Sequence, residues 1–203
     1  MCAGRIACRP PARNRYVRDT PATVICRLRV PASGRALPPG DVGEFRVKGH
    51  VTPGYYADAE QTRAAFDAEG YFVTGDLGLI GDDGRVRFRG RLKEMIKTAG
   101  MNVAPLEVEA VLLSHSAVKQ AYVVGVPDRA RGEVVVAAVE LHDGAPASAE
   151  ALAAFCRERL AGYKVPTRFV FRKADEFPRT PTGKVQKPRL RDELAESVRG
   201  GMP

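Results

Sequence analysis

The segment with the most evident chemical potential runs from Phe177 to Lys184 (FPRTPTGK). Two prolines and one glycine surround a single lysine, and this composition predicts a rigidly framed loop tip that presents one ammonium group. The segment differs from a phosphate-binding P-loop, because no glycine occupies the required upstream position and Val185 follows the lysine. On spacing alone, a solvated surface lysine is the alternative interpretation of Lys184.

A second segment, from Tyr71 to Leu77 (YFVTGDL), ends an aromatic strand in a Gly-Asp step. A carboxylate held on such a turn, here that of Asp76, can accept two hydrogen bonds from a vicinal diol, as acidic residues do for ribose hydroxyls. An aspartate that simply closes a β-turn is the alternative.

A third segment, from Arg89 to Lys97 (RGRLKEMIK), places four basic residues around one glycine and then reaches Gly100. This pattern suits the binding of an anion beside a flexible step of the backbone. The alternative is a basic strand edge that is merely solvated.

The elements that must position these side chains fall into three stretches. Residues 1–35 are rich in Arg, Pro and Cys, and they predict a leader that is either irregular or disordered, in which strand-like periodicity begins only near Val24. Residues 36–90 predict a small β unit, because Glu44–Gly49 alternates apolar and polar residues and an Asp-Gly turn separates two further apolar runs.

Residues 91–203 alternate helix and strand patterns. Helices are expected from Pro105 to Ser114, from Ser148 to Leu160 and from Pro188 onward, and strands at Val118–Val126, Glu133–Leu141 and Arg168–Arg172. The predicted fold class is therefore α+β: a small β unit hinged near residues 90–93 to a compact domain with a central three-stranded sheet flanked by helices.

Charge and composition argue against several classes of function. Residues 1–40 contain eight arginines and one acid, whereas residues 41–203 contain 24 basic and 23 acidic residues. With this balance and no Trp, the sequence predicts no nucleic-acid binding. No apolar stretch is long enough to span a membrane, and the scattered Cys and His predict no metal site. A reducing, cytoplasmic compartment is expected.

Taken in chain order, the motifs around Gly43–Tyr55, Tyr71–Leu77, Gly90–Glu109 and Pro181–Lys184 resemble the adenylate-forming (AMP-binding) superfamily of acyl-CoA synthetases, luciferases and peptide-synthetase adenylation domains. The resemblance covers residues 36–198 and concerns only the C-terminal portion of the family. The run Lys-Glu-Met-Ile-Lys after Gly-Arg-Leu is more similar to the acyl-CoA synthetase, or fatty-acid–CoA ligase, branch than to the peptide-synthetase branch.

The resemblance implies a role for each matching residue. Asp76 matches the acid that holds the ribose hydroxyls of ATP and AMP, and Arg91 matches an arginine that contacts ribose and phosphates. Lys184 matches the catalytic lysine of the first half-reaction, which bridges the carboxylate of the substrate and the α-phosphate. Such an ammonium group, preorganised where negative charge accumulates, typically contributes about 10²–10³ in rate.

The resemblance also implies a swinging domain. Lys93 falls on the hinge position, Lys97 matches a catalytic lysine used after the swing, and the Ala99-Gly100 step matches the face that meets the pantetheine arm of CoA. The implied reaction converts a carboxylic acid, ATP and CoA to acyl-CoA, AMP and pyrophosphate through an acyl-adenylate. Mg²⁺ is expected with the ATP, without ligands in this chain. Fatty and aromatic acids both remain open as substrates, with medium-to-long fatty acids the family's expectation.

The first 36 residues show no Ser/Thr/Gly/Lys-rich phosphate loop of the kind that the family carries upstream. The abrupt change in Arg, Pro and Cys content suggests the hypothesis that residues 1–25 are read out of frame. The isolated chain is accordingly expected to be incomplete and inactive. The alternative is a non-catalytic remnant, or a docking module that complements a separate large adenylation domain; the oligomeric state is left open.

Overall fold

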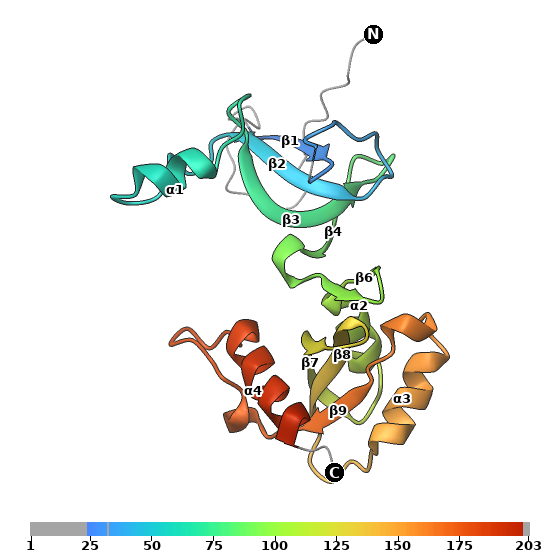
Figure 1. Cartoon of the computed structure of the whole chain (residues 1–203). Coiled ribbons are helices and arrows are strands. Elements are labelled where there is room, and N and C mark those ends of the chain that lie inside the picture. Colours follow the sequence, from blue (N-terminus) through green and yellow to red (C-terminus); the bar gives the residue numbers. More distant parts are fainter. Residues whose placement is uncertain (1–23, 32, 201–203) are drawn as a thin grey trace, which may run out of the picture. The chain divides into compact units, whose positions relative to one another are not determined.

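The computed structural model describes residues 24–31 and 33–200, which form two compact units (Figure 1). Unit 1 reaches to Lys93 and unit 2 begins at Glu94. Among the described residues, no helix combines the length and the apolar character needed to cross a bilayer.

Unit 1 is built on a four-stranded antiparallel sheet in the order β1-β2-β3-β4. Its strands are β1 (Val24–Arg29), β2 (Gly43–Gly49), β3 (Phe72–Ile80) and β4 (Val86–Arg91). The short helix α1 (Ala59–Ala64) follows β2, and the side chain of Asp58 caps it by accepting a hydrogen bond from the Gln61 N–H. The Asp-Gly hairpin expected from the sequence is the β3–β4 connection.

A small apolar core holds this sheet together, formed by Leu28, Phe45 and Ile80. Gly78 is required beside it, because a Cβ at this position would lie 2.4 Å from the Phe45 ring and 2.4 Å from the Arg87 carbonyl oxygen. Because Gly78 has no side chain, the Phe45 ring and the backbone of β4 can both approach β3 closely at this position.

Strand β1 lies inside residues 1–35, for which the composition predicts an irregular leader. It pairs with β2 along its full length, from Val24 opposite Gly49 to Arg29 opposite Glu44. Leu28 is buried in the core of unit 1, so this part of the leader is ordered by packing that its composition does not reveal. Residues 1–23, where the rest of the leader was expected, lie outside the described residues.

Unit 2 contains a five-stranded sheet centred on β8 (Gly132–Leu141). This strand pairs antiparallel with β7 (Val118–Asp128) along its length and antiparallel with β5 (Ile96–Thr98) at Gly132. It pairs parallel with β9 (Arg168–Phe171), while β6 (Met101–Val103) pairs with β5. The three strands expected from the sequence are β7, β8 and β9, and the structure adds the short hairpin β5–β6.

The helices of unit 2 cover both faces of its sheet. Figure 1 shows α3 (Ala149–Arg157) and α4 (Lys187–Gly200) on opposite sides, and α2 (Pro105–Leu113) packs on the α3 side. Alternate residues of β8 divide between the two cores: Val135 and Ala137 face α2 and α3, whereas Val136 and Ala138 face α4. Three short 3₁₀ turns complete the described part of the chain: η1 (Leu92–Glu94), η2 (Gly162–Lys164) and η3 (Ala174–Glu176).

Candidate functional site

Lys184 lies on a closed hairpin loop directly before α4. Arg179 and Val185 form an isolated β-bridge, and the Thr180 N–H donates to the Lys184 carbonyl over 2.8 Å. Gly183, with a φ of +82°, makes the tight turn and donates its N–H to the Thr180 carbonyl over 2.8 Å. The segment that the sequence predicts to be a framed tip is thus closed by its own main chain.

Contacts with the rest of unit 2 fix this loop at its base. Arg179 donates from Nη1 to the Gly183 carbonyl over 2.9 Å and from Nη2 to Gln120 Oε1 over 3.1 Å. Phe177 is buried, with its ring edge-on to Tyr122 at a centroid distance of 5.1 Å. Lys184 itself is exposed, and within the described parts of the chain its Nζ takes part in no hydrogen bond or ion pair.

A charged cluster anchors the start of α4, three residues after Lys184. Lys187 Nζ lies 2.9 Å from Glu109 Oε1 and 3.1 Å from Glu94 Oε2. Glu109 is buried, and its Oε1 also accepts the Val123 N–H over 2.7 Å. Lys187 therefore ties the helix to α2, to β7 and to the first residue of unit 2, and no sequence pattern pointed to it.

The residues expected to face CoA lie on the β5–β6 hairpin. Thr98 pairs with Met101, and the two-residue turn between them has Ala99 at φ +48° and Gly100 at φ +77°. Two successive positive φ values define a type I′ turn, which matches the twist of a tight hairpin. Lys97, Ala99 and Gly100 are all exposed. The turn is held to the β7–β8 connection because the Ala99 N–H donates to the Arg131 carbonyl over 2.8 Å.

Asp76 and Arg91 lie opposite each other on β3 and β4. Arg91 Nε is 2.9 Å from Asp76 Oδ1, an ion pair without hydrogen-bond geometry, and this buried oxygen accepts no hydrogen bond from the residues described. Thr74 fixes the backbone before the carboxylate, because its hydroxyl donates to the Phe45 carbonyl over 2.7 Å and accepts the Asp76 N–H over 3.0 Å. The sequence indicated Asp76 and Arg91 separately and did not predict their pairing.

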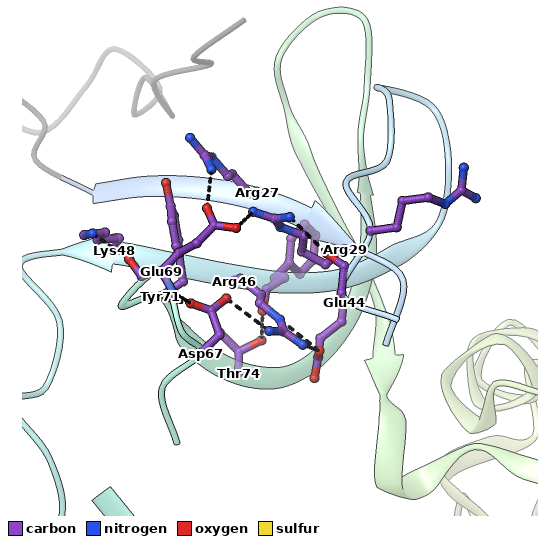
Figure 2. Close-up of polar contacts among 12 residues, drawn as sticks. Arg27, Arg29, Glu44, Arg46, Lys48, Asp67, Glu69, Tyr71 and Thr74 are labelled. Carbon is purple, nitrogen blue, oxygen red and sulfur yellow. Dashed lines mark hydrogen bonds and ion pairs between the residues drawn. The ribbon is translucent and has the colours of Figure 1, made fainter. Parts of the chain in front are cut away.

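A network of ion pairs holds the strands of unit 1 that precede Asp76 (Figure 2). Arg46 on β2 lies between Glu44 and Asp67, with 3.1 Å from a guanidinium nitrogen to each carboxylate. Glu69 binds the two arginines of β1, Arg27 over 3.1 Å and Arg29 over 2.6 Å. The network therefore joins β1, β2 and the turn that leads into β3.

Asp67 is the best-satisfied carboxylate of this network. Burial opposes its ionisation, but hydrogen bonds from the N–H groups of Tyr71 and Glu69 and from the Arg46 guanidinium outweigh that effect, so the pKa of Asp67 lies below its ordinary value. An ionised Asp67 therefore stabilises the turn at neutral pH.

The remaining predicted position, Lys93, is an exposed residue of η1 at the last position of unit 1. The structure thus brings Asp76 together with Arg91, and Lys97 together with Ala99 and Gly100, while Lys184 has a loop of its own. No set of three or more His, Cys, Asp or Glu side chains in the described regions is arranged to hold a metal ion.

Comparison with protein families finds a match within unit 2. Residues 107–184 match the family model of the AMP-binding enzyme C-terminal domain, and the match ends on Lys184. Among curated relatives, the 2-succinylbenzoate–CoA ligase of Geobacillus kaustophilus is 45% identical over 168 residues, covering 82% of this chain and 33% of its own length. The long-chain-fatty-acid–CoA ligase of Bacillus subtilis is 42% identical over 166 residues, covering 81% of this chain and 29% of its own.

The solved structures give the same result for the fold. ATP-bound MatB from Rhodopseudomonas palustris superposes with a TM-score of 0.80 at 36% identity, over 86% of this chain and 35% of that one. The chain spans about a third of the length of the curated relatives that it matches. The family-model match, the acyl-CoA ligase relatives and the shared fold together show that this chain belongs to the adenylate-forming, AMP-binding superfamily and contains the C-terminal domain of that family.

Proposed function

We propose that the chain supplies the C-terminal part of an ATP-dependent acyl-CoA synthetase. In the first half-reaction a carboxylate oxygen of the substrate attacks the α-phosphorus of ATP, pyrophosphate leaves, and an acyl-adenylate forms. In the second, the CoA thiol gives up its proton, its sulfur attacks the acyl carbon, and AMP leaves. Both steps join or separate anions, so both need cationic groups from the protein.

The observation that carries this proposal is the position of Lys184. Lys184 directly follows a tight turn closed by main-chain hydrogen bonds, and no described residue engages its ammonium group. Because these bonds fix the main chain of the loop, only the lysine side chain itself has to be ordered when its ammonium group meets a ligand. We propose that this ammonium group stabilises the negative charge that builds up between the substrate carboxylate and the α-phosphate in the first half-reaction.

Asp76 and Arg91 are proposed to bind the nucleotide. Asp76 Oδ1 is a buried acceptor without a hydrogen-bond donor among the described residues, and a ribose hydroxyl would satisfy it. The guanidinium of Arg91, 2.9 Å away, lies where it could contact the ribose and phosphates as well. In the same scheme Lys93 is the hinge, Lys97 acts in the second half-reaction and the Ala99-Gly100 turn meets the pantetheine arm.

The substrate is proposed to be a carboxylic acid of medium-to-long chain length, and the compartment the cytoplasm. A relative named for long-chain fatty acids supports the first assignment, whereas a relative named for 2-succinylbenzoate keeps aromatic acids open. ATP, used with Mg²⁺, and CoA are the co-substrates. The chain alone is expected to catalyse neither half-reaction, because the acyl and adenine pockets are expected in a separate adenylation region.

The test is ATP–pyrophosphate exchange by the chain mixed with, or fused to, the upstream adenylation region of the Bacillus subtilis long-chain-fatty-acid–CoA ligase. Exchange should rise above that of the upstream region alone, and Lys184→Ala should lower it by about 10²–10³. Lys173→Ala, at another exposed lysine of unit 2, serves as the matched control and should leave the rate unchanged. Exchange that survives Lys184→Ala would refute the proposal, and a chain that never raises exchange would be a non-catalytic remnant.

A further inference from the structure

One carboxylate of unit 2 is shared between the β5–β6 hairpin and the C-terminal helix. Glu133 Oε2 accepts the main-chain N–H of Lys97 over 2.8 Å, and Glu133 Oε1 lies 2.7 Å from Arg191 Nη2 on α4. The Glu133 side chain is only 22% exposed. Both of its oxygens are therefore used inside the protein, which leaves Glu133 suited to holding other groups in place.

The sheet has a space reserved for this carboxylate. A Cβ added to Gly125 on β7 would lie 3.0 Å from Glu133 Oε2 and 2.9 Å from Ile96 Cγ2. Both distances are too short for ordinary contact, so a side chain at this position would push the carboxylate or β5 away. Gly125 therefore allows Glu133 to lie against the sheet where it can reach Lys97.

The hairpin has few other attachments to the central strand. Strand β5 pairs with β8 only at Thr98 opposite Gly132, and the next main-chain link is the hydrogen bond from Ala99 to Arg131. Glu133 adds a third main-chain attachment, at Lys97, just before the Ala99-Gly100 turn. A charge-assisted bond of this kind is stronger than one between neutral groups.

The same helix serves the other functional loop. Arg191 follows Lys187 by one helical turn, and Lys187 fixes the start of α4 directly after the Lys184 loop. Two cations one turn apart on α4 thus fix the helix: Arg191 binds the carboxylate that holds the hairpin of Lys97, and Lys187 binds Glu94 and Glu109 just after the loop of Lys184.

We propose that Glu133 is a positioning residue for the β5–β6 hairpin, held in place by Arg191. This inference rests on the proposed function, in which Lys97 and the Ala99-Gly100 turn serve the CoA-dependent step. Glu133 touches no substrate in this scheme: it fixes the main chain at Lys97, so the thioester step depends on it and the adenylation step does not. A displacement of about 1 Å at a reacting group can cost about 10²-fold in rate, so a single attachment is enough to matter.

The experiment compares four variants of the full chain: Glu133→Ala, Glu133→Gln, Arg191→Gln and Arg189→Gln. Arg189→Gln is the matched control, because Arg189 lies on the same helix and pairs with Glu193, but it is 68% exposed and does not contact Glu133. Amide hydrogen exchange of the Lys97 N–H is followed by NMR in the chain by itself. Both half-reactions are then measured with the upstream adenylation region supplied as above.

Glu133→Ala should raise the exchange rate of the Lys97 N–H at least about tenfold, because the acceptor is lost. It should also slow acyl transfer to CoA by about 10–100-fold while leaving ATP–pyrophosphate exchange unchanged. Glu133→Gln keeps an acceptor oxygen, and Arg191→Gln keeps the carboxylate, so both should show the same two effects as Glu133→Ala but to a smaller extent. Arg189→Gln should show neither effect.

Unchanged Lys97 exchange in Glu133→Ala would overturn the proposal, and so would an equal loss in both half-reactions. If the wild-type chain supports neither half-reaction, the proposed function fails. The hydrogen-exchange comparison then decides by itself whether Glu133 positions the hairpin.

Discussion

At the scale of single residues, the β5–β6 hairpin depends on a backbone conformation that most side chains avoid. Gly100 has a φ of +77°, and a Cβ there would meet nothing within 4 Å. Gly100→Ala should therefore destabilise unit 2 by about 1 kcal/mol through backbone strain alone. Gly162→Ala is the control, because its Cβ also meets nothing within 4 Å but its φ lies outside the left-handed region. Urea denaturation measures both, and equal effects would argue against the strain.

Cys156 reports on the integrity of unit 2. The thiol is fully buried on α3 among the side chains that cover the sheet, and this burial raises its pKa above the ordinary value. The neutral, inaccessible thiol should resist iodoacetamide in the native protein at pH 7.5 and react only after unfolding. Peptide mapping by mass spectrometry would test this, and rapid native labelling of Cys156 would contradict the packing.

Residue types could be recognised from the sequence, but their partners could not. The sequence motifs around Asp76 and Arg91 point to a functional acid and a functional base, but they do not predict that the two form an ion pair. Their pairing depends on a register shift between Leu77 and Gly78. A β-bulge of this kind cannot be deduced by counting residues back from the turn, so the sequence does not reveal which residues face each other. Glu133 was missed for a similar reason, since a single acid within an apolar strand indicates no function until β5 and α4 are placed beside it.

At the scale of elements, the turn before β3 should make unit 1 sensitive to acid. The pKa of Asp67 is lower in the folded protein than in the unfolded chain, so its stabilising effect is complete above about pH 4 and is lost as the pH falls further. Asp67→Asn should cost about 1–3 kcal/mol at pH 7, and its deficit should shrink at pH 3.

The measurement is urea denaturation of both proteins at the two pH values. Asp82→Asn, at an exposed position of the β3–β4 turn, provides the comparison and should change little. A deficit for Asp67→Asn that persists undiminished at pH 3 would show that the carboxylate does not act through its charge.

Longer elements were predictable because their patterns extend over several periods. The α2 helix begins at Pro105 and α3 follows the Ser148 cap, and strands β7 and β8 occupy the expected apolar runs. The strands β5 and β6 have three residues each, which is too short for alternation to be seen. Helix α1 was likewise missed, because none of its six residues is buried and it therefore has no apolar face.

At the scale of the whole molecule, the division at Lys93 implies that damage to one unit need not reach the other. Leu190 is fully buried on α4, and Leu190→Ala should destabilise unit 2 by about 2–5 kcal/mol. Hydrogen exchange should then accelerate in β7 and β8 and stay at the wild-type rate in β2 and β3. Leu113→Ala, at a leucine that is 50% exposed, is the matched control. Faster exchange in both units would show that they unfold together.

Strand β1 has a consequence for how the protein can be shortened. It occupies the edge of the unit 1 sheet beside β2, and its Leu28 contributes to the only core cluster found among the described residues of that unit. A polypeptide that begins at residue 36, where the resemblance to the family begins, would lack β1. The main-chain groups of β2 that pair with β1 would then have no partner, and Phe45 would lose its contact with Leu28. Such a bare edge invites the strands of other molecules to add to it. Precipitation of the trimmed form, rather than a clean domain, is the expected result.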